Sequence, residues 1–135
     1  MANWYGTART NYFMVKDAAA FKAWVDSLPS CVLIENDDGA FGFYVDSEDS
    51  GGFPSERYDE ANDDYVDIDL ADELVPHLAD GEVAILMEAG AEKARYITGY
   101  ALAVAWDGRN TSVDLCDIYD KAQTEFGVKP NEARY

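Results

Sequence analysis

The sequence predicts an α+β domain built on a mainly antiparallel sheet of about five to seven strands with two to three helices. Short apolar or alternating runs recur along the chain, with turn signals such as residues 36–39 and Asp107-Gly108 between them. Short turns join strands that run antiparallel. Helical patterns interrupt the strands without regular alternation, which favours a layered fold over a doubly wound one. We expect a single domain over residues 1–127 and a tail over residues 128–135.

The first elements are a strand region and an amphipathic helix. Residues 4–15 are rich in Tyr, Phe, Thr and Val, which predicts one or two short strands. Asp17 suits the N-cap of a helix, and Pro29 ends it. Between them the apolar side chains recur at helical spacing, so we expect them to face the core. They are Phe21, Trp24, Val25 and Leu28.

A hairpin and a long loop follow. Residues 31–34 and 40–45 are apolar runs on either side of the turn at 36–39, which predicts two paired strands. Residues 46–64 contain Gly51-Gly52, Pro54 and many acidic residues. This composition predicts a long, exposed loop, and structureless loops of that length in compact domains are usually functional.

The next stretch predicts a half-buried strand and a broken helix. Val66, Ile68 and Leu70 alternate with acidic or aromatic residues, the period of a strand with one buried face. A short helical pattern follows up to Gly81. Pro76 cannot lie deep inside a helix, so we expect this helix to be interrupted.

The last third predicts three strands and a helix. The strands are expected over residues 83–87, 96–106 and 111–115, with a turn at 90–93 between the first two. Asp117 suits the start of the final helix and Gly127 its end. We expect the inner side of this helix to carry its apolar residues, Ile118, Tyr119, Ala122 and Phe126.

Charge is concentrated in one segment. The 135 residues include 27 Asp and Glu against 10 Lys and Arg, a net charge of −17. Residues 35–80 alone hold sixteen acidic residues and one basic residue, Arg57, for a net charge of −15. Nucleic-acid and anionic-membrane sites need clustered Lys and Arg. We therefore expect no direct binding to nucleic acid and no binding to a membrane.

No targeting or membrane-spanning pattern is expected. The first residues lack a basic stretch followed by an apolar one, which a secretory signal would require. The longest apolar stretch, residues 100–106, is too short to span a bilayer. These observations predict a cytoplasmic protein.

The residues that usually carry catalysis or metal binding are sparse, so we expect no enzyme, no catalytic residue and no cofactor. His77 is the single histidine, and no Gly-x-Ser-x-Gly motif occurs. The two cysteines, Cys31 and Cys116, predict reduced, buried thiols. Asp46, Glu48, Ser50 and Gly51 match part of a calcium-binding loop, but Arg57 stands where its bidentate Glu should be. We expect no metal site.

The acidic segment itself is the candidate binding site. A row of carboxylates on a strand and its flanking loop can imitate the charge density of a nucleic-acid backbone. Aromatic residues among the acids can anchor a protein interface, which acids alone do poorly. The predicted partner-binding residues are Asp46, Glu48, Asp49, Glu56, Asp59, Glu60, Asp63, Asp64, Asp67 and Asp69, with Phe53, Tyr58 and Tyr65.

Three short stretches resemble known sequences. Asn3-Trp4-Tyr5-Gly6-Thr7, residues 11–17 with Ala20-Phe21, and residues 80–84 resemble small uncharacterised proteins of bacterial phages and plasmids. In charge and size the chain is also similar to DNA-mimicking anti-restriction and anti-CRISPR proteins. That similarity implies a role in blocking a host defence system, inside the host bacterial cytoplasm, and identifies no residue.

The leading hypothesis is a non-enzymatic acidic inhibitor that mimics nucleic-acid charge. Its partner would be a basic nucleic-acid-binding protein of a host defence system. The alternative is an acidic binding module of another kind, either a hard-cation binder or an antitoxin-like partner of a basic protein. The third hypothesis is a small enzyme, which the lone histidine and the missing motifs disfavour.

Overall fold

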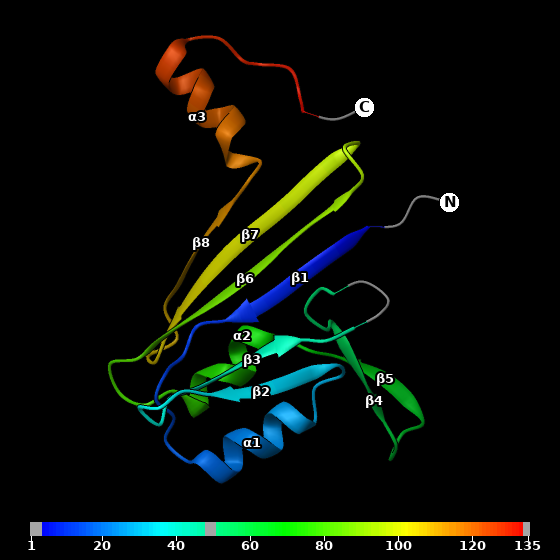
Figure 1. Ribbon diagram of the computed structural model, residues 1–135, viewed down its shortest axis with the longest axis vertical. Coiled ribbons are helices and arrows are strands. Elements are labelled where there is room, and N and C mark those ends of the chain that lie inside the picture. Colours follow the sequence, from blue (N-terminus) through cyan, green and yellow to red (C-terminus); the bar gives the residue numbers. More distant parts are fainter. Residues whose placement is uncertain (1–3, 48–50, 134–135) are drawn as a thin grey trace.

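A six-stranded antiparallel sheet dominates the computed structural model, which describes residues 4–47 and 51–133 (Figure 1). A separate two-stranded hairpin is formed by β4 (Glu56–Asp59) and β5 (Asp64–Asp67). This architecture confirms the predicted α+β class and its mainly antiparallel sheet. Listed from one edge to the other, the six strands are β2 (Cys31–Glu35), β3 (Phe41–Val45), β1 (Tyr5–Thr10), β6 (Val83–Glu92), β7 (Tyr96–Ala105) and β8 (Asn110–Asp114).

The helices begin and end where local chemistry predicts. The Asp17 carboxylate accepts a hydrogen bond from the backbone nitrogen of Ala20 at 3.1 Å and so caps α1 (Ala18–Asp26). The second helix is interrupted as Pro76 predicts, because α2 (Leu70–Leu74) continues as a 3₁₀ turn, η1 (Val75–His77). Gly127, in the left-handed conformation with φ 74°, ends α3 (Asp117–Phe126).

The core lies between α1, α2 and η1 and one face of the sheet. Phe21 of α1 is fully buried, and its ring centroid lies 5.6 Å from that of Phe13 and 6.0 Å from that of Phe41. Leu74 and Leu78 close the core from the second helical unit, and Leu86 and Val104 line its floor on β6 and β7. This packing confirms the predicted inward face of the first helix.

Three predicted boundaries are wrong, each for a local reason. The expected turn at 90–93 begins only at Lys93, because β6 continues to Glu92, where Gly90 pairs with Thr98 and leaves space for the Trp4 ring. The expected strand over 65–70 stops at Asp67, because the Asp69 carboxylate caps α2 by accepting from the Asp72 backbone nitrogen at 3.1 Å. The expected loop at 46–64 contains β4, because residues 56–59 pair with β5.

The last helix is the largest departure from expectation. We expected its apolar residues to face the core, yet Ile118 is 58% and Phe126 is 78% exposed. Figure 1 shows α3 continuing beyond the end of β8, away from the other helices. Cys116, expected to be buried, is exposed at the start of this helix, whereas burial raises the pKa of Cys31 to about 11. Among the described residues no helix has the length and apolarity to cross a bilayer.

Candidate functional site

The hairpin of residues 56–67 stands apart from the main sheet, and we call it the acidic arm (Figure 1). Its twelve residues carry a net charge of −5, because six are acidic and Arg57 alone is basic. All four residues of β5 are exposed. The arm therefore presents a dense set of carboxylates to solvent, as the sequence predicts. The acidic residues are Glu56, Asp59, Glu60, Asp63, Asp64 and Asp67.

Two of these acids build the turn of the arm. The Asp59 carboxylate accepts hydrogen bonds from the Ala61 backbone nitrogen at 3.0 Å and from the Asn62 side chain at 2.7 Å. Asp63 adopts a left-handed conformation with φ 50° and accepts a hydrogen bond from the Tyr58 hydroxyl. That bond raises the pKa of Tyr58, so the hydroxyl keeps its proton. The carboxylates of Asp59 and Asp63 thus stabilise the turn of the arm through hydrogen bonds, in addition to contributing charge.

Like charges face one another across the two strands. The register pairs Glu56 with Asp67 and Asp59 with Asp64. Directly opposed residues in an antiparallel pair have Cα atoms about 4.5–5.5 Å apart. Like charges at that position destabilise a hairpin, whereas opposite charges would stabilise it. The arm therefore keeps an arrangement that disfavours its own folding, which indicates selection for something other than stability.

The base of the arm is tied to the helices through its one cation. Arg57 forms an ion pair with Glu73 of α2 and donates to the Ser27 hydroxyl at 3.3 Å. Glu73 Oε1 also accepts from Trp24 Nε1 at 3.0 Å. Because the Arg57 side chain is largely shielded from solvent, its charge offsets Glu73 and does little for the carboxylates on the arm. Sequence reasoning identified Arg57 as the one cation of residues 35–80 and as the departure from the calcium-loop pattern, and missed this anchoring role.

The pairing also divides the arm into two faces. One face of the arm is joined to α2 by the ion pair of Arg57 with Glu73. This face carries Arg57, Asp59, Asp64 and Val66. The opposite face carries Tyr58 and Tyr65, whose rings meet edge to face with centroids 5.5 Å apart. They are 48% and 61% exposed, and the facing acids Glu56 and Asp67 lie beside them. One face of the arm thus combines two exposed aromatic rings with two carboxylates.

The other predicted site residues lie outside the arm. Asp46 is exposed just after β3, and Asp69 is exposed while capping α2. Glu48 and Asp49 fall outside the described residues. Phe53 is half-buried against the core, with its ring centroid 6.0 Å from that of Phe43. It thus lies apart from the exposed tyrosines of the arm, and its role as a partner anchor stays a prediction.

A hollow of about 430 Å³ lies between the start of α2 and the sheet, and the two acids that line it, Glu88 and Asp69, are engaged in structural contacts. Glu88 Oε1 accepts from the Phe53 backbone nitrogen at 2.6 Å, and Asp69 caps the helix. Burial, with the nearby charge of Glu88, raises the pKa of Tyr100. Within residues 4–47 and 51–133 no three His, Cys, Asp or Glu side chains are placed to hold a metal ion.

His77 also has a structural environment. Its ring stacks on Trp24 with centroids 5.1 Å apart and meets the edge of Phe21 at 5.7 Å. Burial lowers its pKa, against an opposing effect of Asp17. These contacts describe a packing residue of the core rim.

Comparisons with known proteins add no relative. Searches against protein-family models, curated proteins and solved structures found no match to this chain. The geometry and charge of the acidic arm are therefore the features from which a function can be inferred.

Proposed function

We propose that this protein is a non-enzymatic inhibitor that occupies the nucleic-acid-binding site of a basic protein. The observation that carries the proposal is the outward face of the acidic arm, where facing carboxylates flank two exposed tyrosines. Long-range attraction between opposite charges speeds the encounter with a basic cleft, and aromatic rings supply the short-range anchors. The uncompensated acid pairs cost stability, so a binding role explains why they are present.

The partner that fits this chemistry is a nucleic-acid-binding protein of a bacterial defence system. A cleft lined with Lys and Arg for phosphates accepts a surface of carboxylates for the same electrostatic reason. A chain that blocks such a cleft, as an anti-CRISPR or anti-restriction inhibitor does, would act in the cytoplasm of the host bacterium. The charge of the arm and the resemblance of the sequence to phage and plasmid proteins together support a partner of this class.

The test compares two variants with the same total charge. The arm variant carries Glu56→Gln, Glu60→Gln, Asp64→Asn and Asp67→Asn, and spares Asp59 and Asp63 because their carboxylates hold the turn of the arm. At position 64 the amide oxygen of Asn can still accept the hydrogen bond from the Tyr65 backbone nitrogen. The matched control neutralises four exposed acids elsewhere, Asp26, Asp37, Asp38 and Asp80. Proteins retained from a bacterial lysate by the wild type and by each variant are identified, and duplex DNA or RNA is then added as a competitor.

We expect the wild type and the control to retain the same basic protein and the arm variant to lose it. Added nucleic acid should release the captured protein, because both ligands compete for one cleft. With the purified partner, the arm variant should associate more slowly and with a shallower salt dependence. Retention that follows total charge alone would overturn the proposal. A captured basic protein that nucleic acid does not release would favour the antitoxin-like alternative.

A further inference from the structure

Within residues 4–47 and 51–133, no helix covers one face of the six-stranded sheet. The register places one residue from each strand in a continuous row across this open face, in the order Val32, Tyr44, Arg9, Met87, Ala101 and Val113. Met87 is 55% and Val113 is 65% exposed. Neighbouring positions on the same face of β6 and β7 are mostly alanine or other apolar residues. Arg9 is the one charged residue that the register of the described strands places on it.

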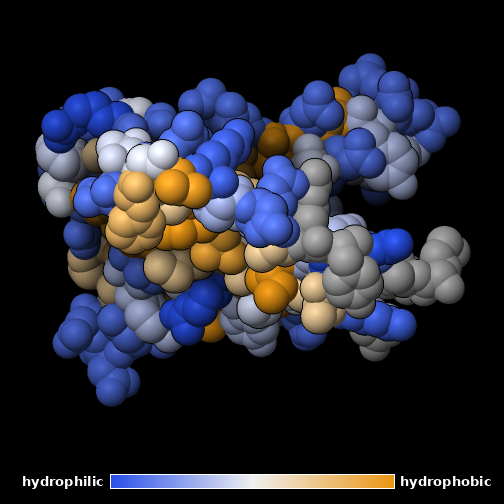
Figure 2. All heavy atoms as spheres, turned by 90° about the horizontal axis from the view of Figure 1, so that it is seen from above, coloured by the Kyte–Doolittle hydropathy of each residue, from blue (hydrophilic) through white to orange (hydrophobic). Residues whose placement is uncertain are grey.

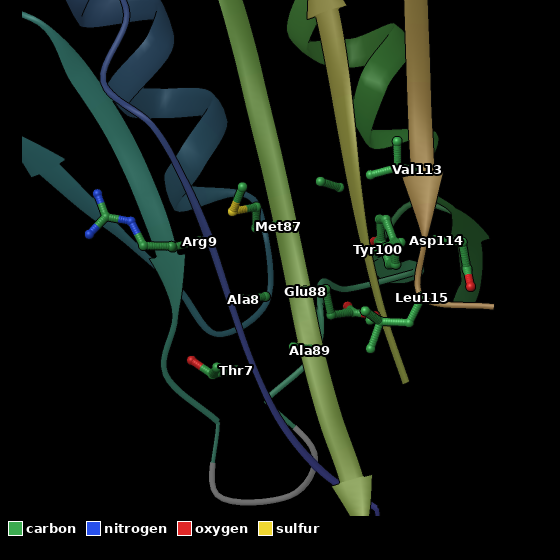
Figure 3. A pocket seen from close by; sticks show the side chains of 12 residues that line it. Thr7, Ala8, Arg9, Met87, Glu88, Ala89, Tyr100, Val113, Asp114 and Leu115 are labelled. Carbon is green, nitrogen blue, oxygen red and sulfur yellow. The ribbon is translucent and has the colours of Figure 1, made fainter. Parts of the chain in front are cut away.

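A groove of about 420 Å³ runs along this open face between β1 and β8 (Figure 3). Figure 3 shows Val113 and Leu115 directed from the β8 side toward β6 and Met87 standing on the opposite wall. Alanine at the centre keeps the floor low, so the groove can accept the side chains of another element. Its lining includes Thr7, Met87, Ala89, Ala101, Val113 and Leu115.

The last helix carries an apolar stripe that no described part of the same chain buries. Ile118, Ala122 and Phe126 recur at four-residue spacing, so they share one side of α3. Ile118 and Phe126 are more than half exposed, and Val128 beyond the helix is 69% exposed. Figure 2, which looks toward the α3 end, shows hydrophobic side chains at the surface among hydrophilic ones. The chain therefore leaves both a groove and a stripe of matching chemistry open to solvent.

The helix cannot reach the groove of its own chain without breaking the turn before it. The Asp114 backbone nitrogen donates to Asp117 at 2.8 Å, and the Cys116 backbone nitrogen donates to Asp114 at 2.8 Å. The Leu115 backbone nitrogen donates to the Gly99 carbonyl at 2.9 Å, which fixes the chain to β7 as far as Leu115, just before the N-cap residue Cys116. These bonds aim α3 past the end of the sheet, as Figure 1 shows.

Surface area and charge both point to a second copy as the occupant. The chain exposes 8930 Å², whereas a folded monomer of this mass exposes about 7,000 Å². The excess exceeds the roughly 800 Å² that each partner buries in a standard interface. Two copies of a chain with net charge −17 repel one another most weakly where their acids are few, and Arg9 is the one charged side chain that the described strands place on the open face. Across such a contact Arg9 would meet Glu125, the acid that helical spacing places beside the stripe.

We propose that two copies of this chain form a symmetric dimer in which α3 of each copy lies in the groove of the other. A two-fold axis satisfies both sites at once, because each copy offers one stripe and one groove. The contact buries Ile118 and Phe126 against the alanine floor between Met87 and Val113. The proposal stands on surfaces other than the acidic arm, so it can fail while the proposed inhibitor function holds.

The first test measures mass in solution by analytical ultracentrifugation. We expect the wild type to change from monomer to dimer between about 1 and about 100 μM, the weak end of affinities for an interface of standard size. A helix variant, Ile118→Glu with Phe126→Glu, and a groove variant, Met87→Glu with Val113→Glu, should each weaken association at least about tenfold. All four positions are exposed, so melting temperatures should change little. The control, Tyr65→Glu with Val66→Glu, adds the same charge to the acidic arm and should associate as the wild type does.

The second test mixes the helix variant with the groove variant. A mixed dimer brings one intact α3 to one intact groove, so its dissociation constant should be lower than that of either variant alone. If the open faces simply stacked without α3, mixing would restore nothing and the exchange of helices would be overturned. A wild type that stays monomeric throughout, or a helix variant that associates as the wild type does, would overturn the proposal as well.

Discussion

Trp24 is the residue that joins the core to the acidic arm. Its ring meets Phe43 edge to face at 5.7 Å, and its Nε1 donates to the same Glu73 that holds Arg57. Trp24→Ala should lower the free energy of unfolding by about 3 kcal/mol, the lower end for large aromatic truncations, because the ring is half-buried. Urea unfolding followed by circular dichroism measures the loss.

Trp24→Phe separates the two functions of this side chain. It keeps most of the ring contacts and removes the hydrogen bond to Glu73, so it should cost less than the alanine variant. We expect faster hydrogen exchange in β4 and β5 with little change in β6 and β7. Equal losses for the two variants would show that the hydrogen bond, and not the ring packing, dominates the contribution of Trp24.

His77 should make stability depend on pH. Burial between Trp24 and Phe21 lowers its pKa in the folded state, while the unfolded chain keeps a value near about 6.5. Near and below that value the unfolded state binds more protons, so this contribution to stability falls as the pH decreases and levels off below the folded pKa.

The difference between wild type and His77→Gln isolates this effect from the titration of the many carboxylates. The melting temperature of the wild type minus that of His77→Gln should fall as the pH is lowered from about 7 to about 5. This window spans the ordinary histidine pKa. A gap that stays constant over this window would show that His77 titrates alike in both states.

At the scale of elements, the acids that face one another across the acidic arm destabilise it. Glu56→Lys turns the pair with Asp67 from like to opposite charge. The change should stabilise the protein by about 0.5 kcal/mol, within the range for cross-strand charge pairs. It should also weaken partner binding, since it places a cation on the outward face. Thermal unfolding and partner association are measured on the same preparation. A destabilised variant would contradict the assigned register.

The elements that the sequence predicts well are those with a dense local signal. The spacing of Phe21, Trp24 and Leu28 and the cap at Asp17 define α1 without any tertiary information. β4 was missed because Glu56 and Asp59 give it no apolar alternation, and its pairing with β5 supplies the strand. For α3 the helix itself is predicted correctly, but an apolar stripe does not indicate which surface covers it, and here no surface in the described part of the chain does.

For the whole molecule, the position of the acidic segment can be predicted from the sequence, whereas the open face of the six-stranded sheet cannot. The acidic stretch over residues 35–80 is visible in composition, and the arm lies within it. The open face depends on strand order. β1 lies between β3 and β6, whereas β2, the strand that follows β1 in the sequence, lies at the edge of the sheet. Arg9, Met87 and Val113 meet in one row only through that order. The candidate site was therefore largely predictable, and the second surface was not.

The two proposed surfaces should respond to salt in opposite directions. Raising NaCl from about 0.1 to about 1 M shortens the Debye length from about 10 to about 3 Å. A complex held by the carboxylates of the acidic arm should weaken, because it depends on attraction to a basic cleft. The dimer should tighten, because screening relieves repulsion between two chains of net charge −17 and leaves the apolar groove contact unchanged.

The sign of the salt effect on the dimer also decides what holds it together. Each copy contributes one Arg9 to the contact with α3, so ion pairs across it are few compared with the total repulsion. Ultracentrifugation of the wild type in both buffers gives the two dissociation constants directly. A dimer that weakens at high salt would mean that Arg9 and the acids of α3 outweigh burial of Phe126 and Ile118. Arg9→Gln would then lose that salt dependence, whereas a dimer held by apolar burial keeps its tightening in the same variant.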